Sequence, residues 1–272
     1  MAKVFSVLSM NVEHFSRENT DEEKVVAHIQ KHNPDVFGLY EVEGPDIHGF
    51  ITDHFPDYLT LITEGQQLQE ILVACRKKFK KINFFQRHEF KVGNPALRPG
   101  VLLSFEASGD LYGLLFLHTD SGTEAPDFGN RAEMFEHAFH LKEALDKKYG
   151  KHTNFMALGD LNTMGLKYPT QKKANARVAD SLEIANLQTQ ADKVKMRVLS
   201  KSHPATHFSP RFGETDLDHI VASTALKFRQ FSQSGKQFEV KVDGWNNLTG
   251  DARADYLNQI SDHCALYCEV IK

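Results

Sequence analysis

Side chains that bind metal ions or phosphate follow several apolar runs of this sequence. Asn11, Glu41 and His118 each end such a run, and Asp160 and Asn162 follow another. Carboxylate and amide oxygens suit Mg²⁺ or Mn²⁺, and an imidazole can transfer a proton near neutral pH. A rigid scaffold presents its chemistry on the loops at the ends of its strands. The pattern therefore predicts one site assembled from distant parts of the chain.

The C-terminal third adds polar residues of the same kinds. Asp218 opens one apolar run, and Asp262 and His263 precede the last one. Each residue has an ordinary explanation when it is taken singly, because Asn forms turns and most of the 14 histidines belong to the surface or the core. Glu41 is more informative, since a buried carboxylate without a partner is costly. The combination, more than any single member, predicts a function.

Short, β-rich apolar runs recur along the chain and predict the strands that must position these residues. Residues 21–31, with an acidic first turn, and residues 131–148, with apolar side chains on one face, predict helices. The order of the elements favours a mixed sheet in each half of one domain, residues 1–272. The predicted strands cover residues 4–12, 36–42, 71–75, 101–105, 111–117, 155–158, 217–221 and 264–271.

Composition places the chain among ordinary globular proteins, with 41% hydrophobic and 25% charged residues. A net charge of −4 provides no global positive field for polyanions. Cys75, Cys264 and Cys268 lack the spacing of a zinc site or a disulfide framework, so we expect reduced core thiols. The first ten residues lack signal-peptide features, and no apolar run approaches ~18 residues. We therefore expect a cytoplasmic protein that does not insert into a membrane.

Five segments, in this order, resemble the endonuclease/exonuclease/phosphatase superfamily, which has the DNase I-like fold. Gly159-Asp160-Leu161-Asn162 and Ser261-Asp262-His263 are the most specific of them. The resemblance spans nearly the whole chain and implies an α/β (α+β) fold, a four-layer sandwich of two face-packed mixed β-sheets flanked by helices. The other segments are Ser9-Met10-Asn11-Val12, Gly38-Leu39-Tyr40-Glu41-Val42 and Leu117-His118-Thr119.

The resemblance also implies a metal site. Glu41 corresponds to the principal metal carboxylate, and Asn11 and Asp262 are expected near the same ion. Hard oxygen ligands of this kind suit Mg²⁺ or Mn²⁺, which keep water in their shell and bridge to a substrate phosphate.

The resemblance further implies roles in catalysis for two pairs of residues. Asp160 and Asn162 would orient the attacking water and hold the phosphoryl oxygens. His263 would stand beside the scissile phosphate, paired with Asp218, because a carboxylate on one ring nitrogen fixes the tautomer and stabilises the imidazolium. Which histidine acts as acid and which as base stays open.

A second acid–imidazole pair is implied for His118. The segment from Gln69 to Val73 resembles the one whose glutamate partners the middle histidine of DNase I-like enzymes, which assigns Glu70 to His118. Exonuclease III-like abasic-site endonucleases usually carry tyrosine at the position of His118, so this chain departs from them. DNase I, sphingomyelinases and several phosphatases keep a histidine there.

Substrate choice depends on the loops, where several cations are candidates. Arg98 and Arg131 are candidate phosphate binders, although an Arg in such positions is often a surface ion-pair residue. Residues 167–177 and 193–201 carry basic side chains that could follow a nucleic-acid backbone or belong to solvated loops. The basic segment 76–81 is interpreted as a hairpin turn.

These observations favour a divalent-metal-dependent hydrolase of phosphate esters, in the first place a phosphodiesterase or nuclease acting on nucleic acid. The alternative is a phosphomonoesterase or a lipid phosphodiesterase with an inositol phosphate, nucleotide or sphingomyelin substrate. An inactive binding module on the same fold is a third reading, and the intact set of carboxylates and histidines argues against it. No protein partner is inferable from the sequence.

Overall fold

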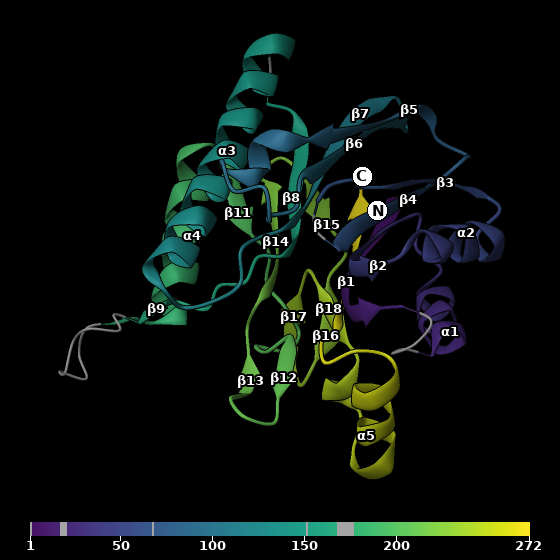
Figure 1. Cartoon of the computed structure of the whole chain (residues 1–272). Helices are drawn as coiled ribbons and strands as arrows, with labels where there is room; N and C mark the ends of the chain where they lie inside the picture. The colour runs from purple at the N-terminus through teal and green to yellow at the C-terminus, as the bar shows by residue number, and fades with distance from the viewer. Residues whose placement is uncertain (1, 17–20, 67, 151, 168–176) are drawn as a thin grey trace.

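Two β-sheets form the centre of the molecule in a computed structural model that describes residues 2–16, 21–66, 68–150, 152–167 and 177–272 (Figure 1). The first sheet has the strand order β15-β19-β1-β2-β4-β3, and β18 also pairs with β19. The pair β1–β2 is parallel, whereas the other pairs of this sheet are antiparallel. Its strands are β1 (Lys3–Phe15), β2 (Val36–Glu43), β3 (Tyr58–Ile62), β4 (Gln69–Arg76), β15 (Lys227–Phe228), β18 (Lys241–Asp243) and β19 (Ala265–Ile271).

The second sheet has the strand order β11-β14-β8-β7-β6-β5. Here the pair β7–β8 is parallel, and its neighbours are antiparallel. Both sheets are therefore mixed, as predicted. The strands are β5 (Lys80–Arg87), β6 (Gly100–Ala107), β7 (Asp110–His118), β8 (Asn154–Asp160), β11 (Met196–Val198) and β14 (Asp218–Ser223).

Helices cover the outer faces of both sheets, as Figure 1 shows. The helices α1 (Glu22–His32), α2 (Pro45–His54) and α5 (Gly250–Gln259) accompany the first sheet, and α3 (Ala125–Tyr149) and α4 (Asp180–Lys193) accompany the second. One apolar cluster fills the space between the sheets, and another joins α3 and α4 to the second sheet. The predicted four-layer α/β sandwich is confirmed.

Local signals in the sequence explain where the first βαβ unit turns. The side chain of Asp21 caps α1 by accepting a hydrogen bond from the backbone of Lys24, and Asn33 ends the helix in the left-handed conformation. Pro34 follows and cannot continue a helix. The chain then enters β2, which lies parallel to β1, so the ends of both strands meet at the same edge.

The basic segment 76–81 is a turn, but the predicted hairpin is wrong. It joins β4 in the first sheet to β5 in the second, and these strands pair with different partners. Phe79 explains the crossing, because its ring packs against Phe5 and Phe105 at centroid distances of 6.4 and 4.8 Å. This partly buried aromatic side chain in the turn packs against the core between the sheets, which draws the chain across.

Smaller elements extend from the sandwich. The hairpin β12 (His207–Ser209) and β13 (Gly213–Thr215) begins beside the last strand, because His207 forms an isolated bridge with His263. The other small pairs are β9 (Leu166–Lys167) with β10 (Arg177–Val178) and β16 (Phe231–Gln233) with β17 (Lys236–Phe238), and the 3₁₀ helices are η1 (His88–Lys91) and η2 (Trp245–Asn247).

Cys75, Cys264 and Cys268 are buried free thiols, which confirms them as core residues. Within the described part of the chain, no helix combines the length and apolar character needed to cross a membrane.

Candidate active site

The ends of the two parallel strand pairs converge on one group of polar side chains. Asn11 and Glu41 come from the ends of β1 and β2, while His118 and Asp160 are neighbours at the ends of β7 and β8. Because β1 and β8 face each other across the core, the four residues meet where the two sheets end. The site therefore takes its residues from both halves of the sandwich.

Asn11 links the two carboxylates of this group. Its Nδ2 atom donates hydrogen bonds of 2.9 Å to Oε1 of Glu41 and to Oδ2 of Asp160. The Nε2 atom of His118 lies 3.6 Å from the same two oxygens. Two carboxylates thus point at one small volume, and an amide and an imidazole hold them there.

The backbone at these positions is unusual. Glu41 and Asn162 have φ angles of 62° and 44°, in the left-handed region that non-glycine residues seldom adopt. Gly159 has a φ of 147°, and a Cβ atom there would lie 1.9 Å from the carbonyl oxygen of Leu117. The glycine of Gly-Asp-x-Asn is therefore required for the close approach of β8 to β7. Backbone strain of this kind is common where function fixes a side chain.

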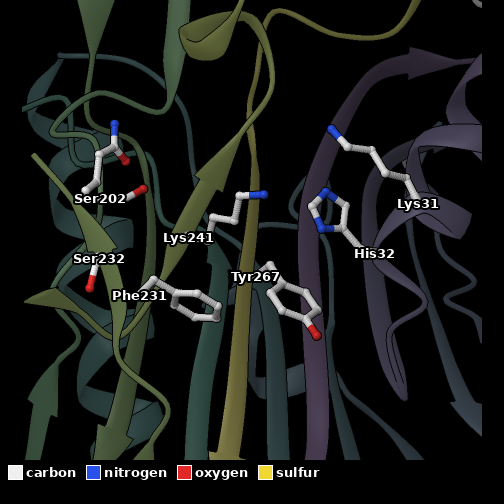
Figure 2. Close-up of a pocket in the computed structure, with 8 residues that line it drawn as sticks. Lys31, His32, Ser202, Phe231, Ser232, Lys241 and Tyr267 are labelled. Atoms are coloured by element: carbon white, nitrogen blue, oxygen red, sulfur yellow. The ribbon is translucent and has the colours of Figure 1, made fainter.

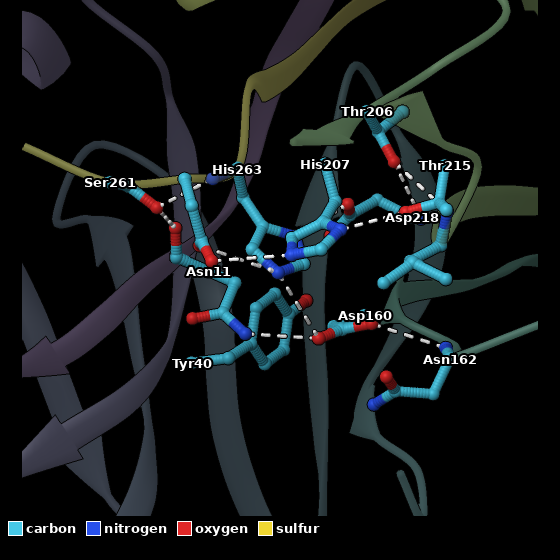
Figure 3. A network of polar contacts seen from close by, with 12 residues as sticks. Asn11, Tyr40, Asp160, Asn162, Thr206, His207, Thr215, Asp218, Ser261 and His263 are labelled. Atoms are coloured by element: carbon cyan, nitrogen blue, oxygen red, sulfur yellow. Dashed lines mark hydrogen bonds and ion pairs between the residues drawn. The ribbon is translucent and has the colours of Figure 1, made fainter. Parts of the chain in front are cut away.

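His263 is held on several sides (Figure 3). Its Nδ1 atom lies 2.8 Å from Oδ2 of Asp218, and its Nε2 atom faces Oδ2 of Asp160 at 3.9 Å. The hydroxyl of Ser261 accepts a hydrogen bond from the backbone N–H of His263 and donates one to the carbonyl of Asn11. The Ser-Asp-His segment is thereby tied to the end of β1.

Neighbouring carboxylates raise the pKa of His263 more than burial lowers it. Burial alone would lower the pKa of His263, but the charges of Asp218 and Asp160 and the hydrogen bond to Asp218 raise it to about 10. The imidazole is therefore positively charged at neutral pH. Burial raises the pKa of Asp160 to about 7, although the charge of His263 opposes the rise. Asp160 and His263 accordingly form one acid–base unit.

Asp262 lies beside two residues that were not assigned from the sequence. His207 places its Nε2 atom 3.2 Å from Oδ2 of Asp262, and Glu13 accepts a hydrogen bond of 3.0 Å from the Asp262 backbone N–H. Burial and the charge of Asp262 raise the pKa of Glu13, and Glu41 adds to the rise. Glu13 stands two positions after Asn11, but its φ angle of 42° in the irregular end of β1 means that strand alternation could not have identified it.

The donor set fits a divalent cation. Glu41, Asp160 and His118 bring one ligand atom each to within 4.8 Å of one another. Burial and neighbouring negative charges disfavour the charged forms of Asp160 and Glu13. A cation bound among these carboxylates would stabilise their negative charge. The carboxylate oxygens of this group suit Mg²⁺ or Mn²⁺, whereas the imidazole of His118 is not a donor of that type.

The predicted pair of Glu70 and His118 is not formed. The Nδ1 atom of His118 is buried without a hydrogen-bond partner among the described residues, while its other ring nitrogen faces Glu41 and Asp160. Glu70 accepts a hydrogen bond from the hydroxyl of Thr63. In the structure the Glu70 carboxylate therefore bonds to Thr63 in place of the predicted contact with His118.

The two predicted phosphate-binding arginines have different surroundings. Arg98 donates to the side chain of Gln69, which in turn donates to Glu41, so its guanidinium borders the site. Arg131 is fully buried and makes a 2.8 Å ion pair with Glu183. Its other donors are used by the carbonyls of Asp120, Gly122 and Gly165. The prediction that Arg131 binds substrate is therefore wrong, because no donor is left for a ligand.

Two of the four cations in the second basic segment form ion pairs. Arg197 pairs with Glu239, and Lys201 pairs with Asp216. In the first basic segment, residues 168–176 lie outside the described residues, which leaves Lys167 and Arg177. These segments give little support to a continuous track for a nucleic-acid backbone.

Several solved structures share this architecture. TDP2 from D. rerio, humanized by 14 mutations, is 15% identical with a TM-score of 0.66, and the match covers 98% of this chain and 99% of that one. Truncated TDP2 from Caenorhabditis elegans is 16% identical with a TM-score of 0.66, and the match covers 98% of both chains. The 3'-5' exonuclease NExo from Neisseria meningitidis is 15% identical with a TM-score of 0.60, covering 98% of this chain and 100% of its own.

These identities are low enough that the structures show a shared fold alone. No curated protein matches the sequence. A family model does match, over residues 8–263, and its range includes every one of the convergent residues from Asn11 to His263. The chain therefore belongs to the endonuclease/exonuclease/phosphatase family.

Proposed function

We propose that this protein is a divalent-metal-dependent phosphodiesterase that acts on nucleic acid, and that residues 1–272 work as one catalytic unit. The observation that carries the proposal is the position of Asp160. Its Oδ2 atom bonds to Asn11, and lies within 3.9 Å of His263 and 3.6 Å of His118. One buried carboxylate thus contacts the groups that hydrolysis of a phosphate ester needs.

Mg²⁺ or Mn²⁺ would be held by Glu41, Asn11 and Asp262. Glu13 is a further carboxylate beside Asp262. When it is bound, such an ion neutralises charge on the phosphoryl oxygens and on the leaving group. The Nδ2 atom of Asn11 donates to Glu41 and its Oδ1 atom accepts from the backbone of Glu13, so the amide orients both carboxylate-bearing segments. This arrangement fixes the position of the acidic groups before a substrate arrives.

The protein's own groups divide the remaining work. His263 is charged through Asp218, so its Nε2–H would donate a hydrogen bond to a phosphoryl oxygen and stabilise the developing negative charge. Asp160, with its raised pKa, would take the proton from the attacking water. The backbone N–H of Asn162 donates a 3.1 Å hydrogen bond to Oδ1 of Asp160 and so fixes that carboxylate. Arg98 would bind a further phosphate of the substrate.

Two structural neighbours support nucleic acid as the substrate class. D. rerio TDP2 has been solved in complex with single strand DNA product. NExo has been solved bound to a product DNA hairpin, and that structure describes it as a 3' phosphatase. The second description favours one further candidate for this chain, a phosphomonoesterase that removes terminal phosphate from DNA. No contact in the described residues favours a lipid or an inositol phosphate.

A substrate panel tests the proposal. Plasmid DNA, single-stranded DNA, RNA, a 3'-phosphorylated oligonucleotide, bis-p-nitrophenyl phosphate and p-nitrophenyl phosphate would be incubated with the protein in Mg²⁺ or Mn²⁺. We expect cleavage of DNA and of the diester, lost in Asp160→Asn and retained in Asp46→Asn, which removes an exposed acid. Release of phosphate from the monoesters alone would select the phosphomonoesterase. Turnover of no nucleic acid and no diester would refute the proposed function.

A further inference from the structure

A second group of metal-ligating side chains lies apart from the catalytic residues, between α1 and β18. His28 and His32 are four residues apart on α1, and Asp243 ends β18. One ligand atom from each of the three residues lies within 4.8 Å of the others. The group shares no residue with the active site. Nothing in the phosphodiesterase mechanism uses it.

Helix geometry brings the two histidines together. Residues at positions i and i+4 lie on the same face of a helix, and the two rings have a centroid distance of 5.3 Å. The Nε2 atom of His32 lies 2.9 Å from Oδ2 of Asp243. The other carboxylate oxygen, Oδ1, accepts a 3.1 Å hydrogen bond from Asn247, which fixes the orientation of the carboxylate. Fixed outer partners of this kind are typical of metal ligands.

His28 supplies an independent observation. Its side chain is buried, with 9% exposure, and its Nε2 atom has no hydrogen-bond partner among the described residues. A buried polar atom without a partner is costly and rare in folded proteins. A cation at this position would satisfy it.

We propose that His28, His32 and Asp243 bind a transition-metal dication of the zinc type. Two imidazoles and one carboxylate form a donor set that zinc accepts, whereas Mg²⁺ prefers oxygen donors alone. Zinc ligands lie about 2.0–2.2 Å from the ion, so small side-chain rotations suffice to close the group around one ion. Binding replaces the hydrogen bond between His32 and Asp243, and the His32 proton moves from Nε2 to Nδ1 so that Nε2 can bind the ion.

Two lysines compete with the ion for Asp243. Lys31 lies 2.8 Å from Oδ2 and Lys241 lies 3.6 Å from Oδ1. Both side chains are well exposed, at 60% and 42%, so they can move into solvent when an ion binds. Figure 2 shows their amino groups near the His32 ring, at a cavity of 580 Å³ that Tyr267 also lines. Of the three proposed ligands His32 lines this cavity, which gives an ion a path to the group from that side.

A bound ion would have a structural effect. It would join α1 to β18, and through β18 to its neighbour β19 in the first sheet. His28 also packs edge-on against Tyr256 of α5, with a centroid distance of 5.5 Å. The ion would therefore fasten the first helix to the C-terminal part of the first sheet. We expect it to raise the melting temperature.

Titration of the metal-free full chain with Co²⁺ and Zn²⁺ tests the site. Co²⁺ absorbance and bound-metal stoichiometry would be measured for the wild type, His28→Phe, Asp243→Asn, Lys31→Met and Glu41→Gln. His137→Phe is the matched control, since His137 is a helix histidine outside every group described above. We expect His28→Phe and Asp243→Asn to lose one equivalent, or to bind it at least about tenfold more weakly. His137→Phe should bind as many equivalents as the wild type. Glu41→Gln should keep the equivalent held by His28, His32 and Asp243.

Lys31→Met keeps the test decisive if His28→Phe or Asp243→Asn fails to fold. It removes the competing charge, so it should bind Zn²⁺ more tightly than the wild type, by roughly three- to tenfold. Zn²⁺ should also raise the melting temperature of the wild type and Lys31→Met. Unchanged or weaker affinity in Lys31→Met would overturn the proposal. It would also be overturned if folded His28→Phe and Asp243→Asn bound as many equivalents as the wild type.

Discussion

His263 and Asp218 form a buried ion pair in which Nδ1 and Oδ2 are 2.8 Å apart, and both side chains are at most 7% exposed. The opposite ring nitrogen is left for the substrate side, where Asp160 also lies. A histidine held in this way keeps its proton well above neutral pH. Asp218 therefore acts through His263, as a positioning residue that sets the charge of the imidazole.

The pH profile of Asp218→Asn tests this relationship. Removing the carboxylate takes away the largest influence that raises the pKa of His263, so that pKa falls from about 10. The alkaline decline of kcat, which reports loss of the imidazolium proton, should then move to lower pH by about one unit or more. A uniform loss of kcat with the decline at its wild-type pH would mean that Asp218 has only a structural role.

Metal removal should abolish turnover and leave the fold intact. We expect EDTA to stop hydrolysis and Glu41→Gln to remove most of the activity in Mg²⁺ or Mn²⁺, because Glu41 is the principal carboxylate of the proposed ion site. Circular dichroism should show an unchanged fold for Glu41→Gln, since the amide still fits beside Asn11 and Gln69. Activity that persists in EDTA contradicts the metal mechanism.

Glu70 and His118 should act independently of each other. The carboxylate of Glu70 bonds to Thr63, and His118 faces Glu41 and Asp160. In a double-mutant cycle of Glu70→Ala and His118→Ala, the losses in kcat should add to within about 0.5 kcal/mol. A double mutant no worse than His118→Ala alone would show that the two residues do work as a unit during turnover.

Eight of the strands could be predicted from the sequence because their apolar runs are dense. Each of the eight predicted runs coincides with an observed strand, with ends that differ by a few residues. The helices α4 and α5 were missed for the opposite reason. Among its buried residues α4 has only Leu187, Ala191 and the polar Glu183, and α5 buries Tyr256 alone, so neither has a continuous apolar stripe.

The residues of the site were predictable where they end a strand. They were unpredictable where packing determines the direction or the partner of the side chain. Glu13 lies in the irregular end of β1 with a φ of 42°, so alternation along the strand does not show where its side chain points. Arg98 and Arg131 look alike in sequence. Their difference comes from Glu183, which is 52 residues from Arg131 in the chain and reaches it only through the packing of α3 against α4.

Arg98 and Arg131 should therefore affect different measurements. Arg131→Met leaves the Glu183 carboxylate buried without its ion-pair partner, which should cost about 3–5 kcal/mol of unfolding free energy. Arg98→Met should raise KM for a polyanionic substrate with a smaller change in stability. Urea unfolding and steady-state kinetics of both variants would measure this. A large rise in KM for folded Arg131→Met would restore it as a substrate-binding residue.

Asp35 should make stability depend on pH. Its buried carboxylate accepts hydrogen bonds from the backbone and hydroxyl of Ser6 and pairs with Lys78. Burial alone would raise the pKa of Asp35, but the hydrogen bonds to Lys78 and Ser6 lower it below 3.8. Between the folded and unfolded pKa values the unfolded chain binds more protons, so stability rises with pH in that window. The contribution is complete above about pH 5 and is lost as the pH falls through the folded pKa.

Asp35→Asn isolates this contribution. The amide keeps the shape of the side chain but loses the charge and one acceptor, so the variant should be less stable than the wild type by about 2 kcal/mol at pH 7. The difference should shrink as the pH falls below 4 and through the lowered folded pKa of Asp35, because the wild-type carboxyl then loses its charge too. Asp57→Asn, at an exposed position, is the control and should shift the melting temperature little at any pH. A difference between wild type and Asp35→Asn that stays constant from pH 7 to pH 3 would show that packing, and not the charge of Asp35, provides the stability.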